Sequence, residues 1–357
     1  MSGLLLEGAR VIDPSTGADG KRDVLVSNGR IVEPKSVPVT QRKDLSGLWL
    51  FPALTDLRCV LRGPEDVADA IAGGFTCLIA DPSSKPVPDD GIEIAQAAEL
   101  TRGTELGERA PQAPCLSSGF APVATNGLLR RALQHAERKL VMLHAEDVSL
   151  SAGAMLGEST TALRLGLNGA PPEAEVAAIA AALAVLEGST GRIHFSHVTC
   201  KGSVERIAAA KRAGLPVTAD ATPHHIREDD SKAEGYALEA RLWPPLRSRA
   251  DVEAVKKGVI DGTLDAIASD HRRPTILERE HPFEQAAWGR ATLRTAFADV
   301  LAAGVPPARA VALFTSGPMT VLGLPSPTLE PGAPADFAVF DPQGGRMRYT
   351  FVQGASR

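Results

Sequence analysis

The segment "RIHFSHVTCKGSVERIAAAKRAGLPVTADAT", residues 192–222, decides the fold class. Two short apolar runs, 192–199 and 215–222, flank an alanine-rich stretch that ends at Gly214. Short runs rich in Val, Ile and Thr on either side of an amphipathic helical pattern are typical of a βαβ unit with parallel strands. The segment therefore predicts one strand, one helix and a second strand of a parallel sheet.

The same alternation continues in both directions along the chain. A further helix is predicted at 171–189, where proline begins an alanine-rich run. Further strands are predicted at 49–57, 75–81, 113–118, 140–147 and 264–271, with a weaker eighth at 310–317. Seven or eight such units predict an α/β fold, a (β/α)8 TIM barrel over residues 51–324.

The two ends of the chain have another pattern. Residues 3–50 are short apolar runs separated by turn residues, and Asn28–Gly29 is a strong hairpin signal. The segments "PGAPADFAVFDP" and "MRYTFVQG" return to strand patterns after the barrel. We expect residues 1–50 and 325–357 to pair into one small β-sandwich domain.

Composition argues against several classes of protein. The net charge of −5, from 38 basic and 43 acidic residues, includes no basic block, so no nucleic-acid partner is expected. The first residues lack the features of a secretory signal, and no apolar run approaches the roughly 20 residues of a membrane span. We therefore expect a cytoplasmic protein without membrane contact. The four cysteines lack CxxC spacing, so neither a disulfide framework nor a thiolate zinc site is expected.

Polar residues follow several predicted strands, where barrel enzymes carry their chemistry. His144 ends one strand, His197 another, and Asp270 and His271 end a third. A single histidine there is usually structural, but histidines and a carboxylate converging on one barrel mouth suit a Zn²⁺ ion that activates water. Asp270 would then act as the general base.

Several motifs carry a resemblance to a known family. In order, "HAEDVSL", "HFSHVTCKGSVERIAAAKRAGLPVTADATPHH", "WPPLR", "DGTLDAIASDH" and "LEPGAPADFAVFDP" resemble the landmarks of dihydroorotases of the amidohydrolase superfamily. The resemblance runs from about Leu45 to Pro342. It implies metal-ligand positions at His144, His197 and Asp270, the last also a general base, and substrate-binding positions at Arg62 and His271.

The stretch "DLRCVLR", residues 56–62, departs from the family pattern. In the family this strand ends in Asp-x-His-x-His-x-Arg, where the histidines bind metal and the arginine holds the substrate carboxylate. Here Arg58 and Val60 stand at the histidine positions, and Ser118 stands where the family has a bridging acid or lysine. Val60 has no donor electrons and Arg58 is permanently cationic, so a binuclear metal centre is not expected.

The substrate contacts of the family are altered as well. Ser83 and Trp243 stand where the family has asparagines, and Pro274 stands where it has a histidine. We expect the bulky ring of Trp243 to face the pocket. Of the family's substrate clamp, Arg62 is essentially what remains.

These departures favour a non-catalytic dihydroorotase homologue, a pseudoenzyme of pyrimidine biosynthesis without a cofactor. By resemblance it is most like the inactive subunits that associate with aspartate transcarbamoylase, which implies a structural role in a homo- or hetero-oligomer. Two alternatives stay open. One is an active cyclic amidohydrolase with a single zinc held by His144, His197 and Asp270; the other is a sensor that binds a pyrimidine or another carboxylate through Arg62.

Four placements follow from the same pattern. Arg58 is expected to pair with Asp270 and to hold the barrel mouth closed. His194 is an odd number of positions from His197 and is expected to face the helices. His224 and His225 are expected to be structural, and residues 272–282 are expected to form a solvated loop over the mouth.

Overall fold

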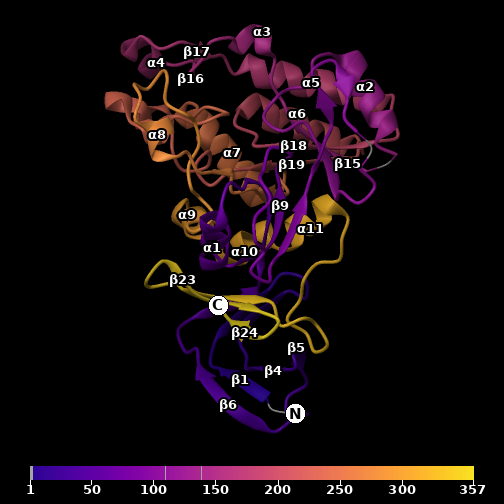
Figure 1. Cartoon of the computed structure of the whole chain (residues 1–357), viewed down its shortest axis with the longest axis vertical. Helices are drawn as coiled ribbons and strands as arrows, with labels where there is room; N and C mark the ends of the chain where they lie inside the picture. The colour runs from indigo at the N-terminus through magenta and orange to yellow at the C-terminus, as the bar shows by residue number, and fades with distance from the viewer. Residues whose placement is uncertain (1–2, 109, 138) are drawn as a thin grey trace.

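The computed structural model describes residues 3–108, 110–137 and 139–357, and its central part is built on parallel strands (Figure 1). One four-stranded sheet has the order β10 (Glu93–Gln96), β9 (Phe75–Ala80), β8 (Leu54–Val60), β21 (His271–Arg272). A six-stranded sheet has the order β11 (Ala98–Glu99), β14 (Cys115–Ser117), β15 (Leu140–His144), β18 (Arg192–Ser196), β19 (Val217–Ala221), β20 (Ala266–Ile267).

The predicted βαβ unit at 192–222 is confirmed, because β18 and β19 pair in parallel and α6 (Lys201–Arg212) lies between them in the chain. Apolar side chains of the strands and helices form one large buried cluster that spans both sheets. The remaining longer helices are α1 (Pro64–Ala72), α2 (Asn126–His135), α5 (Glu173–Glu187), α7 (Arg249–Asp261), α9 (Ala296–Ala302), α10 (Pro307–Phe314) and α11 (Ser316–Leu322).

The ladder of hydrogen bonds does not close into the expected barrel in the described part of the chain. Two segments change partner along their length: β10 pairs with β9 while β11 pairs with β14, and β20 pairs with β19 while β21 pairs with β8. Between β20 and β21, Asp270 has a φ of +52°. This left-handed conformation interrupts an extended strand, so the strands form two open sheets that share one core.

The expected eighth strand at 310–317 is wrong. Residues 307–314 form α10, and α11 follows from Ser316. A short apolar run such as "AVALF" does not by itself distinguish strand from buried helix. Pro307 in the first turn of α10 supplies a preset φ, and the helix then buries Val311 and Phe314.

Strands from both ends of the chain form two further sheets, in the lower part of Figure 1. Antiparallel pairing of β22 with β7 joins the two ends, and apolar residues of both sheets share a second buried cluster. One sheet has β5 (Arg30–Val32), β4 (Val24–Ser27), β1 (Gly3–Glu7) and β6 (Val39–Asp44); the other has β24 (Ala355–Ser356), β23 (Arg346–Val352), β22 (Phe337–Asp341), β7 (Trp49–Pro52), β2 (Arg10–Asp13) and β3 (Ala18–Lys21).

Short elements complete the described chain. Three brief helices lie in connections on the upper side of Figure 1: α3 (Val148–Ser151), α4 (Thr160–Leu165) and α8 (Ile276–Arg279). Among the described residues, no helix has the length and apolar character that crossing a membrane would require.

Asp13 fastens the C-terminal segment to the N-terminal sheet. Its buried carboxylate accepts hydrogen bonds from the Leu329 backbone N–H at 2.7 Å and from Thr328 Oγ1 at 2.8 Å. Burial acts against ionisation, but these bonds and two from Ser15 hold the pKa of Asp13 below its usual value. The carboxylate is therefore a fixed charged acceptor between segments more than 300 residues apart.

We predict that Asp13→Ala lowers the free energy of unfolding by about 1–3 kcal/mol, because it leaves buried donors without an acceptor. Asp19→Ala is the matched control, since Asp19 forms a partly exposed ion pair with Arg10 and should cost less than about 1 kcal/mol. Denaturant unfolding of both variants measures the difference. Equal losses would contradict the role of Asp13.

Candidate active site

A set of polar side chains lies buried where the central strands end. Arg58, His144, His197, His224 and Asp270 are each only 1–4% exposed. The Nδ1 of His144, both ring nitrogens of His197 and His224, both carboxylate oxygens of Asp270 and Nη2 of Arg58 lack hydrogen-bond partners. Buried polar groups are normally hydrogen-bonded, so this cluster marks the candidate site.

Arg58 occupies the site as a buried cation. Its Nε donates to Oδ2 of Asp81 at 3.3 Å, and both side chains are almost fully buried. The expected pairing with Asp270 is therefore wrong. Asp81 directly follows β9, which pairs with β8, and its backbone N–H donates to the carbonyl of Cys59, the residue after Arg58. This hydrogen bond holds the Asp81 carboxylate beside the guanidinium.

Two aromatic rings lie beside this cation. The guanidinium carbon of Arg58 lies 3.8 Å from the ring centre of Phe120, and Phe120 and Trp288 meet edge to face with their ring centres 4.7 Å apart. The guanidinium carbon of Arg272 lies 3.7 Å from the ring centre of Trp288 and 5.6 Å from that of Phe120. We call Arg58, Phe120, Trp288 and Arg272 the mouth stack; cation–π contacts of this kind are attractive, more so where water is excluded.

Two members of the mouth stack, Phe120 and Arg272, also line a neighbouring groove. Phe120 also lies beside His197, with ring centres 6.1 Å apart. A groove of about 750 Å³ next to the mouth is lined by Asp81, Phe120 and Arg272, but neither His197 nor Asp270 lines it. A ligand in this groove therefore does not touch the candidate catalytic carboxylate.

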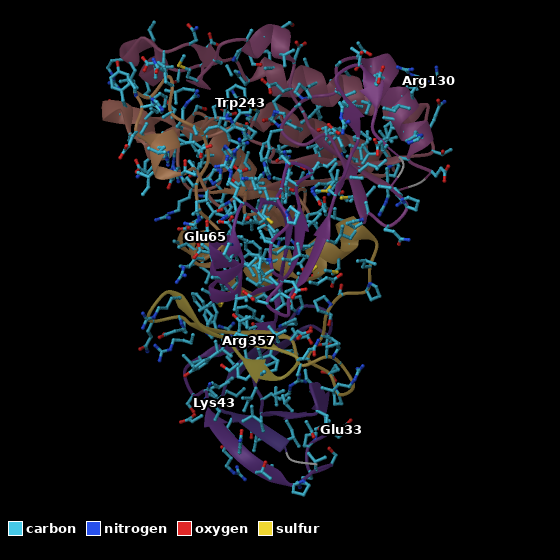
Figure 2. All side chains as sticks on the ribbon, viewed as in Figure 1. Glu33, Lys43, Glu65, Arg130, Trp243 and Arg357 are labelled. Carbon is cyan, nitrogen blue, oxygen red and sulfur yellow. The ribbon has the colours of Figure 1, made fainter. Side chains whose placement is uncertain are left out.

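Glu146 engages one of the two ring nitrogens of His144. The His144 Nε2 donates to Glu146 at 2.8 Å, and Trp243 Nε1 donates to the same oxygen at 3.0 Å. Burial opposes ionisation of Glu146, but bonds from His144 and Ser151 hold its pKa below the usual value. Trp243, in the upper half of Figure 2, thus fixes a carboxylate beside the site.

Asp270 lies between two neutral histidines. Its oxygens are 3.5 Å from His197 Nδ1 and 3.3 Å from His224 Nε2. Burial raises the pKa of Asp270 to about 7, with the positive charge of Arg58 acting in the opposite direction. Burial lowers the pKa of His224 to about 3 and holds that of His197 well below its usual value, a shift that Arg58 reinforces.

The fit of a metal ion to this site can be tested from the donors present. Unpartnered imidazole and carboxylate atoms are suitable donors in kind. In the described residues, however, no group of three or more His, Cys, Asp or Glu side chains has the arrangement to hold a metal ion. Arg58 brings a positive charge into the same space, so the residues present do not fit a metal centre.

Two positions lost from the family pattern serve as structural residues. Val60 is buried in β8 and pairs in register with Arg272. Ser118 accepts a hydrogen bond from the His144 backbone N–H at 2.9 Å through its Oγ, and its own N–H donates to the Met142 carbonyl. Neither side chain supplies a ligand.

The predicted substrate arginine is already bound to a carboxylate of the chain. Arg62 donates from Nη1 and Nη2 to the two oxygens of Glu278, at 2.6 and 3.0 Å. Hydrogen bonds from Arg62 lower the pKa of Glu278 to about 2. Within the segment 272–282, which is expected to form a solvated loop, Glu278 on α8 is partly exposed and forms a bidentate pair with Arg62.

His271, also expected at the substrate, is fully engaged with the protein. Its Nε2 donates to Asp66 at 2.9 Å, and its Nδ1 accepts from the Thr292 and Leu293 backbone N–H groups at 3.0 and 3.2 Å. Both ring nitrogens are thereby satisfied, and the ring has no exposed surface. His271 is a structural residue in this arrangement.

The placement of His194 toward the helices is wrong. Its ring bonds Thr218 and Asp220, at 2.9 and 2.8 Å, and Asp220 also accepts the backbone N–H of His197. His197 lies beyond the end of β18 with a φ of +58°, so the alternation of side chains along a strand does not extend to it. Both histidines consequently lie on the side of Asp220.

The paired histidines after β19 have different roles. His225 is structural as expected, with Thr222 at 2.8 Å on one ring nitrogen and the Pro244 carbonyl at 3.1 Å on the other. His224 belongs instead to the buried cluster through its contact with Asp270. One of the two expectations is therefore confirmed.

Several residues of the site were missed by sequence reasoning, among them Asp81, Glu146, Phe120, Trp288 and Glu278. Asp81 and Glu146 are acids at or just after strand ends, the same signal that singled out Asp270, and could have been found. Phe120 and Glu278 come from connections. Their positions depend on the tertiary structure, and no sequence pattern marks them.

The comparisons with known proteins agree with this architecture. Residues 116–356 match the model of the amidohydrolase family. The chain therefore belongs to that family. Its place within it is that of a dihydroorotase homologue: dihydroorotases of Anaeromyxobacter dehalogenans strain 2CP-C and Pelotomaculum thermopropionicum are 39% and 36% identical to it. They cover 95% of this chain, which spans 88% and 89% of theirs.

Solved structures support the fold alone. The dihydropyrimidinase of Brevibacillus agri NCHU1002 superposes with a TM-score of 0.81 at 18% identity, covering 99% of this chain and 94% of that one. The L-hydantoinase of Arthrobacter aurescens gives 0.78 at 20% identity, covering 94% and 86%. The expected α/β fold of TIM-barrel type is supported at this level.

We predict that Asp270→Asn stabilises the protein relative to the natural chain as pH rises. With a folded pKa of about 7, raised from about 3.9 in an unfolded chain, the stability contribution of Asp270 falls between pH 4 and 7. From pH 5 to pH 8, the difference in unfolding free energy between variant and natural chain should grow by about 1–3 kcal/mol. Denaturant unfolding at both pH values tests this; a constant difference would contradict it.

Proposed function

We propose that this chain is a non-catalytic member of the dihydroorotase family that acts as a structural subunit in pyrimidine biosynthesis. The observation that carries the proposal is the buried guanidinium of Arg58, held by Asp81 and Phe120 at a position where the family resemblance implies a metal-binding histidine. A permanent cation there opposes a divalent ion.

The state of the substrate side supports the same proposal. Glu278 occupies Arg62 with two hydrogen bonds, as a substrate carboxylate would. Trp243 Nε1 also donates to Glu146, the carboxylate that binds His144. In this arrangement the arginine that would clamp a substrate carboxylate is occupied, and Arg58 opposes the metal ion that would activate water.

We predict no measurable hydrolysis of dihydroorotate and fewer than about 0.1 zinc ions per chain after purification in the presence of zinc, against about one for a mononuclear site. Metal content by mass spectrometry and loss of dihydroorotate by absorbance give the two measurements. The dihydroorotase of Anaeromyxobacter dehalogenans, treated identically, is the positive control. About one zinc per chain with turnover that His197→Ala abolishes would overturn the proposal.

The proposed partner is an aspartate transcarbamoylase, by resemblance to inactive family members that associate with that enzyme. We expect the transcarbamoylase of the same organism to co-elute with this chain in size-exclusion chromatography and to lose activity or assembly without it. Arg58→His with Val60→His is an informative variant, because a scaffold should retain the partner whatever its metal positions hold. Full transcarbamoylase activity and assembly without this chain would contradict the role.

A second candidate function is hydrolysis of a cyclic amide with a single zinc. The unpartnered atoms of His144, His197 and Asp270 favour it, since buried polar atoms without partners can serve an absent ligand. It also accords with the names of the relatives at 39% identity. The experiment with zinc and dihydroorotate separates this candidate from the first.

A further inference from the structure

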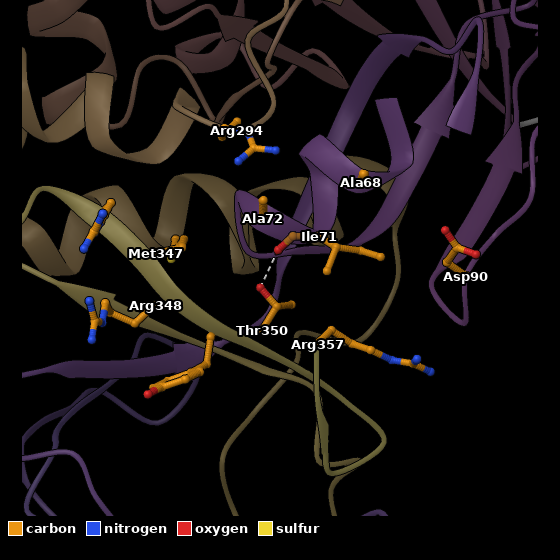
Figure 3. A pocket seen from close by; sticks show the side chains of 11 residues that line it. Ala68, Ile71, Ala72, Asp90, Arg294, Met347, Arg348, Thr350 and Arg357 are labelled. Atoms are coloured by element: carbon orange, nitrogen blue, oxygen red, sulfur yellow. Dashed lines mark hydrogen bonds between the residues drawn. The ribbon is translucent and has the colours of Figure 1, made fainter. Parts of the chain in front are cut away.

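A groove of about 720 Å³ lies between α1 and β23, apart from the candidate active site (Figure 3). Helix α1 contributes Ala68, Ile71 and Ala72 to one wall. Five successive residues of β23, from Arg346 to Thr350, form the other. The groove therefore runs where the central part of the chain meets its terminal strands.

The groove is strongly basic although the whole chain has a net charge of −5. Its lining includes Arg294, Arg346, Arg348 and Arg357, against a single acid, Asp90. Arg294 is paired with Asp69 at 2.7 Å. The other three arginines are exposed and form no ion pair within the described part of the chain. Asp341, outside the lining of the groove, partly offsets the charge of Arg346 and Arg348, because both arginines lower its pKa. The groove therefore keeps an excess of positive charge for a ligand.

The groove follows the edge of a strand. The pairing of β22 with β23 shifts register between Tyr349 and Met347, so the regular alternation of side chains is broken at Arg348. A groove lined by five successive residues of one strand runs along its backbone. β22 pairs with one edge of β23, and β24 covers the other only at Phe351 and Val352. From Arg346 to Tyr349 this second edge has no strand partner among the described residues.

β24 pairs with the same edge of β23 and ends where the open part of that edge begins. The Arg357 N–H donates to the Thr350 carbonyl at 2.8 Å, directly after the pairing of β24 with β23. Thr350 Oγ1 in turn donates to the Ile71 carbonyl on α1, which fixes the helix beside the strand. The space beyond is bounded by apolar side chains of Ile71 and Met347.

We propose that this groove binds an extended, acidic segment of a partner protein, which adds to β23 as a further strand. Backbone hydrogen bonds to the open edge would supply affinity, as in other cases of strand addition. Carboxylates of the segment would meet Arg346, Arg348 and Arg357 in charge-assisted contacts. Its alternate side chains would pack on Ile71 and Met347. This proposal is independent of whether the chain is catalytic.

The lining disfavours a single-stranded nucleic acid. Such ligands are bound by stacking their bases on exposed aromatic rings. The aromatic residue of this groove is Tyr349, and Lys43 Nζ lies over its ring, 3.2 Å from the centre. The ring face is thereby occupied, whereas the backbone edge is open.

The probe is a fluorescein-labelled octapeptide of alternating glutamate and valine, and its binding to the full chain is measured by anisotropy. The double variant Arg346→Glu, Arg348→Glu should weaken the Kd at least about tenfold, because repulsion replaces two charge-assisted contacts. The matched control is Arg130→Glu, Arg131→Glu on α2. Both residues are exposed, and Figure 2 shows Arg130 far from Arg357. It should change the Kd less than about twofold.

A second probe separates strand addition from charge attraction. The same peptide N-methylated at its valines keeps its charge but loses alternate N–H donors, and should bind at least about tenfold more weakly. Arg357→Glu is the substitute if the double variant does not fold by circular dichroism.

Three results with the peptides would overturn the proposal: no binding to the natural chain, equal losses of affinity in the groove and control variants, or undiminished binding of the methylated peptide. A fourth would be displacement of the peptide by a single-stranded oligonucleotide of equal charge, if the binding of that oligonucleotide also depends on Arg346 and Arg348. The last result would assign the groove to nucleic acid.

Discussion

The placement of one buried cation, Arg58, is the constraint on which the candidate site depends. A guanidinium cannot be neutralised by loss of a proton, so it must be compensated where it lies. Asp81 supplies the compensating carboxylate and Phe120 covers the planar face. Trp288 lies against Phe120, and Arg272 against Trp288. The surroundings of the cation are thus supplied by residues distant from it in the sequence.

The electrostatics of the remaining polar groups follow from this cation and from burial. Burial lowers the pKa of both His197 and His224; Arg58 adds to the shift at His197, and Arg290 adds to it at His224. Asp270 has its pKa near neutrality because burial outweighs the attraction of Arg58. At the rim, Arg62 is paired in the same way with a carboxylate of the chain, that of Glu278.

The terminal strands form the second groove of interest, away from the candidate active site. Pairing of β22 with β7 and the hydrogen bonds of Asp13 join the two ends of the chain into sheets beside the central core. This arrangement leaves the second edge of β23 without a strand partner from Arg346 to Tyr349 among the described residues, and brings its arginines together with Arg357. Open strand edges invite pairing with another chain and are usually blunted by charge. Here arginines outnumber acids along the groove, and on this excess the proposed preference for an acidic segment rests.

The sequence by itself determined the parallel α/β class, the βαβ unit at 192–222 and the strand-end positions of His144, His197 and Asp270, because these depend on local periodicity and on motifs. It also determined that Arg58 and Val60 cannot act as metal ligands, which is a matter of side-chain chemistry. Only the tertiary structure decided that Arg58 pairs with Asp81, that Glu278 occupies Arg62, that 310–317 is helical and that His194 faces Asp220. Most of these contacts join residues that are distant in sequence, and others depend on residues with positive φ at strand ends. Periodicity and spacing describe local structure, so they do not determine which side chain lies nearest in space.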